Sequence, residues 1–290
     1  MRLGILMMGT GAYAAANLGV LRALEMRALE PYAVCGMGFG AWPAAQYLCA
    51  MDEAQRMAAC LAAARHGRRF LGLPRGAARV LQGKKTALCD GRGLGRLICA
   101  QAGERMLALS DRRGIFPCRM ATNGRRLVFA TQYYPQGADA TLVTQASLAF
   151  ACRAAMAQPP FLSAMPWLGA PLLAQENPAW AADQLLRLGA DRVLIVCPQV
   201  RTLHEPDAME LCAAHTLWAL EDKLPTGVGI LRLMMPADVG ALSFGEMPRI
   251  AQAGFDGAQA QLDAALYALG MASCRVLPFR PRAQAISRRC

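Results

Sequence analysis

The residues of this chain best placed to hold a catalytic group are Gly36-Met37-Gly38-Phe39-Gly40, a short turn flanked by glycines. The run 32–35 before this turn is apolar and partly β-branched, which predicts a buried strand. A helix is expected from Ala41, with Pro43 tolerated in its first turn. A strand, a tight glycine-flanked turn and a helix are the setting of a G-x-S-x-G nucleophile elbow, whose serine attacks a carbonyl. Because Gly38 has no side chain, the pattern predicts the backbone of an acyl-transfer site without its nucleophile.

A second glycine loop, Gly9-Thr10-Gly11, follows a predicted strand at Leu3–Met8 and precedes a helix expected to end near Glu30. With Ala14, the loop also fits the G-x-G-x-x-[GA] fingerprint of dinucleotide-binding folds. Such folds need an acidic residue at the end of the second strand to bind the ribose. That strand ends here in Cys35-Gly36, so the sequence disfavours nucleotide binding.

Composition limits the class of protein. The 290 residues are 55% hydrophobic and 18% charged, which predicts an ample core. The formal net charge of +11 would suit an anionic partner, but like charges form no long block and no nucleic-acid-binding motif occurs. We therefore expect a scattered basic surface and no nucleic acid. The 11 cysteines include no C-x-x-C pair and the 3 histidines are far apart, so we expect no metal and no cofactor.

Strands and helices alternate at the start of the chain, which predicts a mainly parallel sheet with helices on both faces. We expect the first helix after the elbow to cover 41–64 and a hairpin to turn at Asn123-Gly124, the strongest short hairpin signal in the chain. The remaining expected elements are helices at 76–82, 92–100, 141–156, 178–188, 207–221 and 257–270, and a strand at 192–197. No repeat, linker or charge boundary divides the chain, so we expect a single domain over 1–290.

Five segments, taken in order, resemble the patatin-like phospholipase family. They are Gly9-Thr10-Gly11-Ala12-Tyr13-Ala14 with Gly19-Val20-Leu21, Gly36-Met37-Gly38-Phe39-Gly40-Ala41, Ala121-Thr122-Asn123-Gly124, Gln145-Ala146-Ser147-Leu148-Ala149 with Pro159-Pro160, and Trp167-Leu168-Gly169-Ala170 with Asn177-Pro178 and Leu188-Gly189-Ala190-Asp191. The resemblance implies a three-layer α/β/α patatin-like domain with a mostly parallel central sheet. It covers most of the chain, and the order of the segments carries it more than any one motif does.

The resemblance also implies where a Ser–Asp dyad for acyl hydrolysis would lie. The serine position corresponds to Gly38 and the aspartate position to Leu168, so both catalytic groups are missing. Of the oxyanion loop, Gly9, Thr10, Gly11 and Ala12 remain as backbone donors, although Thr10 replaces a glycine. Gly36, Met37, Phe39 and Gly40 complete the vestigial elbow. We expect Gly38 to have a positive φ and Leu168 to approach it across a small apolar pocket.

Other residues could act as a relocated nucleophile. Ser163 is the nearest in sequence to Leu168, whereas Cys35 is expected in the core and Ser147 is expected to cap or pack a helix. The Asp256-Gly257 pair is expected on the surface of a helix. An active patatin-like phospholipase or esterase with a relocated nucleophile therefore stays open as an alternative.

The sequence favours a catalytically inactive, patatin-like protein related to lipid acyl hydrolases. Its expected ligand is a fatty acid or lysolipid, or else a protein partner, and an anionic membrane surface is a further candidate. The apolar run before Gly9 is too short for a signal peptide. Free cysteines without paired spacing fit a reducing compartment. We therefore expect a cytoplasmic protein, with peripheral membrane association open.

Overall fold

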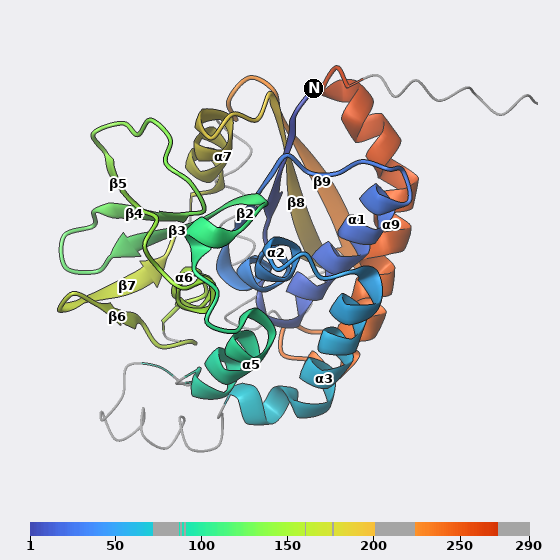
Figure 1. Ribbon diagram of the computed structural model, residues 1–290. Helices are drawn as coiled ribbons and strands as arrows, with labels where there is room; N and C mark the ends of the chain where they lie inside the picture. Colours follow the sequence, from blue (N-terminus) through green and yellow to red (C-terminus); the bar gives the residue numbers. More distant parts are fainter. Residues whose placement is uncertain are drawn as a thin grey trace, which may run out of the picture.

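The computed structural model describes residues 1–71, 87, 89, 91–159, 161–175, 177–200 and 224–271. Its centre is a mixed sheet with the strand order β5-β4-β3-β2-β1-β8-β9 (Figure 1). The pairs of β1 with β2 and β8, of β2 with β3, of β4 with β5 and of β8 with β9 are parallel. The predicted three-layer α/β/α domain with a mostly parallel sheet is confirmed.

The elements follow the alternation expected from the sequence. The strands are β1 (Leu3–Met7), β2 (Ala33–Gly36), β3 (Arg113–Met120), β4 (Arg126–Ala130), β5 (Ala140–Val143), β6 (Met165–Trp167), β7 (Ala170–Ala174), β8 (Arg192–Val200) and β9 (Val228–Met235). The α-helices are α1 (Ala16–Glu25), α2 (Ala41–Leu48), α3 (Glu53–Leu71), α5 (Arg92–Ala102), α6 (Leu148–Ala155), α7 (Pro178–Arg187) and α9 (Met247–Ala268). Short 3₁₀ turns are η1 (Gly11–Ala15), η2 (Gly38–Gly40), η3 (Leu107–Leu109) and η4 (Phe244–Glu246).

Alternating residues of β1 pack into the two hydrophobic cores that lie on opposite faces of the sheet. Leu3, Ile5 and Met7 pack with α1, α2 and α9, whereas Leu6 packs with α7 on the opposite face. Successive side chains of a strand point to opposite faces, so an apolar strand buried on both sides belongs in the middle of a sheet. This explains why the apolar run at the N-terminus forms a central strand.

Helices α1 and α9 lie unusually close together. A Cβ atom added to Gly19 in α1 would lie 2.1 Å from the carbonyl oxygen of Ala251. The reciprocal position in α9 is Gly254, where a Cβ would lie 2.2 Å from the carbonyl oxygen of Ala16. The absence of both side chains lets the backbones touch, so Gly19 of the G-V-L segment has a packing role.

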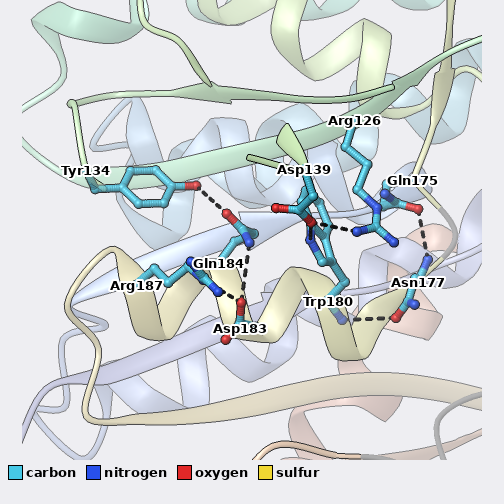
Figure 2. A network of polar contacts seen from close by, with 9 residues as sticks. All are labelled: Arg126, Tyr134, Asp139, Gln175, Asn177, Trp180, Asp183, Gln184 and Arg187. Carbon is cyan, nitrogen blue, oxygen red and sulfur yellow. Dashed lines mark hydrogen bonds and ion pairs between the residues drawn. The ribbon is translucent and has the colours of Figure 1, made fainter. Parts of the chain in front are cut away.

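A polar network fastens α7 to the strands on its side (Figure 2). Asp139 Oδ2 accepts hydrogen bonds from Arg126 Nη1 at 2.7 Å and from Trp180 Nε1 at 3.0 Å. Burial opposes ionisation of Asp139, but these hydrogen bonds outweigh it and lower the pKa of the carboxyl group. Asn177 caps the helix, since its Oδ1 accepts from the backbone N–H of Trp180 at 3.0 Å.

Four sequence expectations are wrong in detail. The helix expected at 257–270 is α9, which begins already at Met247 and ends at Ala268. The single helix over 41–64 is two helices, broken where Ala50 takes a φ of +56°. The expected helix over 141–156 begins only at Leu148, because Thr141–Val143 belong to β5 and pair in parallel with β4. The long loop over 158–171 contains β6 and the start of β7. The helices expected at 76–82 and 207–221 lie outside the described residues.

Candidate functional site

The two glycine loops lie side by side at the carboxyl ends of β1 and β2, as expected. Met7 is in register with Gly36, and the strands continue into loops that contact each other directly. The backbone N–H of Phe39 donates to the carbonyl of Gly9 at 3.0 Å. The N–H of Met37 donates to the carbonyl of Met7, also at 3.0 Å. The carboxyl ends of parallel strands are where such folds place their sites, so this junction is the candidate site.

Gly38 has the backbone of a nucleophile elbow. Its φ is +55°, which confirms the expected positive value. Residues that carry a side chain rarely adopt a positive φ, whereas glycine adopts it without a steric clash because it has no Cβ atom. A Cβ built at this position would lie 3.0 Å from the carbonyl oxygen of Gly9. The turn at Gly38 therefore has a left-handed backbone conformation and offers no side-chain functional group.

The side chain that faces Gly38 is Gln158, a residue that the sequence analysis did not select. Its Nε2 and Oε1 atoms would lie 3.5 and 3.6 Å from a Cβ at Gly38. An amide is neither a general base nor an acid at neutral pH. One feature of the sequence could have pointed to Gln158. It directly precedes Pro159-Pro160, and these two prolines are part of one of the five segments that resemble the family.

The expectation that Leu168 approaches Gly38 across an apolar pocket is wrong. Leu168 and Gly169 form the two-residue turn between β6 and β7, and the Leu168 side chain is 88% exposed. The opposite end of β7 is near the site, because Ala174 N–H donates to the carbonyl of Ala157 at 2.7 Å. A strand rises about 3.3 Å per residue, so the turn stands roughly 17 Å from Ala174. Assignment of the lost aspartate to Leu168 therefore rests on sequence order alone.

The contacts that the structure gives for the substitute nucleophiles favour structural roles. Ser163 Oγ accepts a hydrogen bond from Arg153 Nη2 at 3.1 Å, and a guanidinium cannot take up its proton. Burial, with a smaller contribution from the Cys118 thiol, raises the pKa of Cys35, which keeps it a thiol. As expected, Ser147 is a helix cap that accepts from Phe150 N–H at 3.2 Å, and Asp256 lies on the exposed surface of α9.

The first glycine loop keeps backbone donors available, those of Gly9 and Thr10 among them. Ala12 N–H donates to the carbonyl of Ala241 at 2.7 Å, and Tyr13 N–H to that of Thr10 at 3.2 Å. The N–H groups of Gly9 and Thr10 have no acceptor within the part of the chain that the structure describes. Both residues are half-buried. Two adjacent free N–H groups at the start of a helical segment suit a carboxylate or another oxyanion.

An apolar pocket adjoins both glycine loops. It is lined by ten residues: Gly11, Ala14, Phe39, Trp42, Ala63, Leu94, Leu97, Met156, Phe244 and Met247. The pocket is partly open, and its cavity volume of about 30 Å³ leaves room for only a few water molecules. The rings of Phe39 and Phe244 both line it, with their centroids 6.3 Å apart. Phe244 is half-buried at this position.

The described residues contain no group of three or more metal-ligating side chains. None of their helices is both long and apolar enough to cross a membrane.

Comparison with solved structures identifies the fold as patatin-like. VipD from Legionella pneumophila is similar over 91% of this chain and 67% of its own, with a TM-score of 0.50 and 12% identity. The type III effector protein ExoU is similar over 93% of this chain and 54% of its own, with a TM-score of 0.41 and 15% identity. ExoU in its complex with SpcU from Pseudomonas aeruginosa gives a TM-score of 0.34 at 13% identity over 90% of this chain and 52% of its own.

The chain thus spans between half and two thirds of the length of these proteins. No family description matches the sequence, and no curated protein matches it either. At 12% identity the likeness to VipD establishes the fold alone.

Proposed function

We propose that this protein is a catalytically inactive member of the patatin-like lipid acyl hydrolases that binds an acyl ligand beside its two glycine loops. The observation that carries the proposal is Gly38, which has the φ of a nucleophile elbow, offers no hydroxyl and faces the amide of Gln158. Loss of a nucleophile or its base removes several orders of magnitude in rate in serine hydrolases. The free N–H groups of Gly9 and Thr10 and the adjoining apolar pocket would serve binding.

Labelling with a fluorophosphonate probe tests the catalytic half of the proposal. We expect no label on the wild-type protein, and none on Gly38→Ser, because the new hydroxyl faces an amide. The double variant Gly38→Ser/Gln158→Asp places a carboxylate beside the hydroxyl, and we expect it to be labelled more strongly than Gly38→Ser/Leu168→Asp. The second double variant is the matched control, since it introduces the same two groups but places the carboxylate in the exposed turn between β6 and β7, roughly 17 Å from Ala174.

Two results would change this interpretation. If Gly38→Ser/Leu168→Asp is labelled more strongly than Gly38→Ser/Gln158→Asp, the position of the catalytic acid is Leu168, in the hairpin between β6 and β7. Labelling of the wild-type protein that is lost in Ser163→Ala or Cys35→Ala would establish the alternative, an active phospholipase or esterase with a relocated nucleophile. Circular dichroism of each variant checks that the elbow tolerates the new Cβ atom, which is tight against Gly9.

Titration with oleate tests the binding half. Leu97 is a half-buried residue at the pocket wall, and the indole of Leu97→Trp would occupy space that the chain needs. We expect saturable binding by the wild-type protein and about tenfold weaker binding by Leu97→Trp, which corresponds to about 1.4 kcal/mol. Tyr267→Trp is the control, because Tyr267 is 78% exposed on α9. Absence of saturable binding would leave a protein partner as the ligand.

A further inference from the structure

Two hairpins pack edge to edge and project away from the helices (Figure 1). The first joins β3 to β4 through 121–125, and the second joins β6 to β7 through Leu168 and Gly169. They are linked because β3 pairs antiparallel with β7, with Met120 opposite Leu172. The N–H of Ala121 also donates to the carbonyl of Pro171 at 2.8 Å. We call residues 119–126 and 165–172 together the wing.

The wing displays an apolar side chain at a conformational cost. Leu168 has a φ of +46° and Gly169 a φ of +80°, the pattern of a type I′ turn. Asparagine or glycine normally takes the first of these positions, because the left-handed conformation disfavours larger side chains. Leu168 is nevertheless 88% exposed, the highest value among the large hydrophobic residues that the structure describes. Neither backbone preference nor core packing accounts for a leucine here.

The charge of the wing is also unusual. No acidic residue occurs in 113–130 or 161–175, the segments that build both hairpins. Arg119 lies directly opposite Arg126 in the ladder between β3 and β4, a like-charge pair that disfavours the sheet. Arg126 has an ion pair with Asp139 at 2.7 Å, whereas Arg119 and the exposed Arg125 have none with the described residues. The wing therefore presents both uncompensated positive charge and an exposed leucine.

From these features we propose that the wing docks onto an anionic lipid bilayer, with Leu168 inserted among the acyl chains and Arg119 and Arg125 on the lipid phosphates. An apolar anchor combined with basic residues is the pairing of forces that holds peripheral proteins on anionic membranes. The wing extends from the carboxyl end of β3, the same topological end of the sheet as the glycine loops. The inference needs no acyl pocket and stands independently of the proposed function.

Flotation of the full chain with vesicles tests this proposal. We expect binding to vesicles of phosphatidylcholine with phosphatidylglycerol and little binding to phosphatidylcholine alone. Leu168→Asn should reduce binding about tenfold and leave folding intact, because asparagine suits the first position of a type I′ turn. The control is Leu109→Asn, since Leu109 is 74% exposed and lies in η3, outside the wing.

Arg119→Gln/Arg125→Gln should weaken binding to the anionic vesicles by about tenfold or more. Arg65→Gln/Arg96→Gln removes the same net charge outside the wing and should have a much smaller effect. Equal losses of vesicle binding in the two double arginine variants would show that net charge alone drives binding. That result would overturn the wing as the docking element. Failure of the wild-type protein to float, or unaltered binding by Leu168→Asn, would also overturn it. The oleate titration would be unaffected by either outcome, so the two proposals can fail separately.

Discussion

Substitution of Gly19 by valine is expected to destabilise the protein by about 3 kcal/mol or more. A Cβ atom at this position would lie 2.1 Å from the Ala251 carbonyl and 2.3 Å from the Phe255 nitrogen, both backbone atoms of α9. A flexible side chain could move aside, but a helix backbone can only shift as a unit. The two helices must therefore separate along their length and lose packing between them. Urea unfolding followed by far-UV circular dichroism measures the loss.

Gly95 provides the control for this experiment. It lies within α5, and a Cβ atom there would meet nothing within 4 Å. Gly95→Ala should stabilise the protein by roughly 0.5–1 kcal/mol, because glycine disfavours a helix interior. Gly19→Ala and Gly254→Ala should each destabilise it, and the double variant should lose less than the sum, because the first substitution already separates the helices. Additive losses, or a Gly19→Val protein as stable as wild type, would contradict this account of the helix contact.

Elements with strong local signals could be predicted from the sequence. The buried strands at the start of the chain, the α7 helix with its Asn177 cap and the hairpin at Asn123-Gly124 all carry their own pattern. The elements that were missed depend on distant partners. Thr141–Val143 are a strand because β4 offers them a parallel edge, and no feature of three residues reveals that edge in advance. The same holds for β6 and β7, which pair with each other and with β3.

The candidate site likewise has one part that could be predicted from the sequence and one part that could not. The glycine loops could be placed because each lies at a junction between a strand and a helix, and adjacent parallel strands bring such junctions together. The partner of Gly38 could not be placed. The resemblance of Trp167-Leu168-Gly169-Ala170 to a family segment selected Leu168, but the hairpin carries that residue outward, and Gln158 lies against Gly38 instead. A motif fixes the order of residues along the chain, whereas the pairing of β7 with β3 fixes which of them reaches the site.

Asn17 supports the first glycine loop through two hydrogen bonds of its side-chain amide. It is fully buried, and its Nδ2 donates to the carbonyl of Met8 at 2.7 Å and to that of Ala14 at 3.0 Å. These carbonyls lie on either side of the Gly9-Thr10-Gly11 segment. One amide group, on α1, therefore ties the end of β1 to η1. Replacement of this amide by a carboxyl group should test how strongly the loop depends on it.

Asn17→Asp is expected to destabilise the protein at pH 7.5 much more than at pH 4.5. An ionised carboxylate at this buried position would face two carbonyl oxygens, so the folded state should raise its pKa far above the unfolded value of about 3.9. The folded state then binds the extra proton, and the free energy of unfolding falls by about 1.4 kcal/mol per pH unit until the folded pKa is reached. At low pH the neutral acid can still donate one hydrogen bond, to Met8 or Ala14. Urea unfolding of variant and wild type at both pH values gives the difference.

The same chemical change at Asn177 is the matched control. Asn177 is exposed and caps α7 through its Oδ1 atom, and an aspartate cap serves equally well there. Its charge also lies at the helix N-terminus, so Asn177→Asp should be as stable as wild type or slightly more stable at pH 7.5. An Asn17→Asp protein whose stability tracks that of wild type across this pH range would mean that the loop does not need the amide. A loss confined to Asn17→Asp and growing with pH would identify Asn17 as the residue that keeps the N–H groups of Gly9 and Thr10 in position.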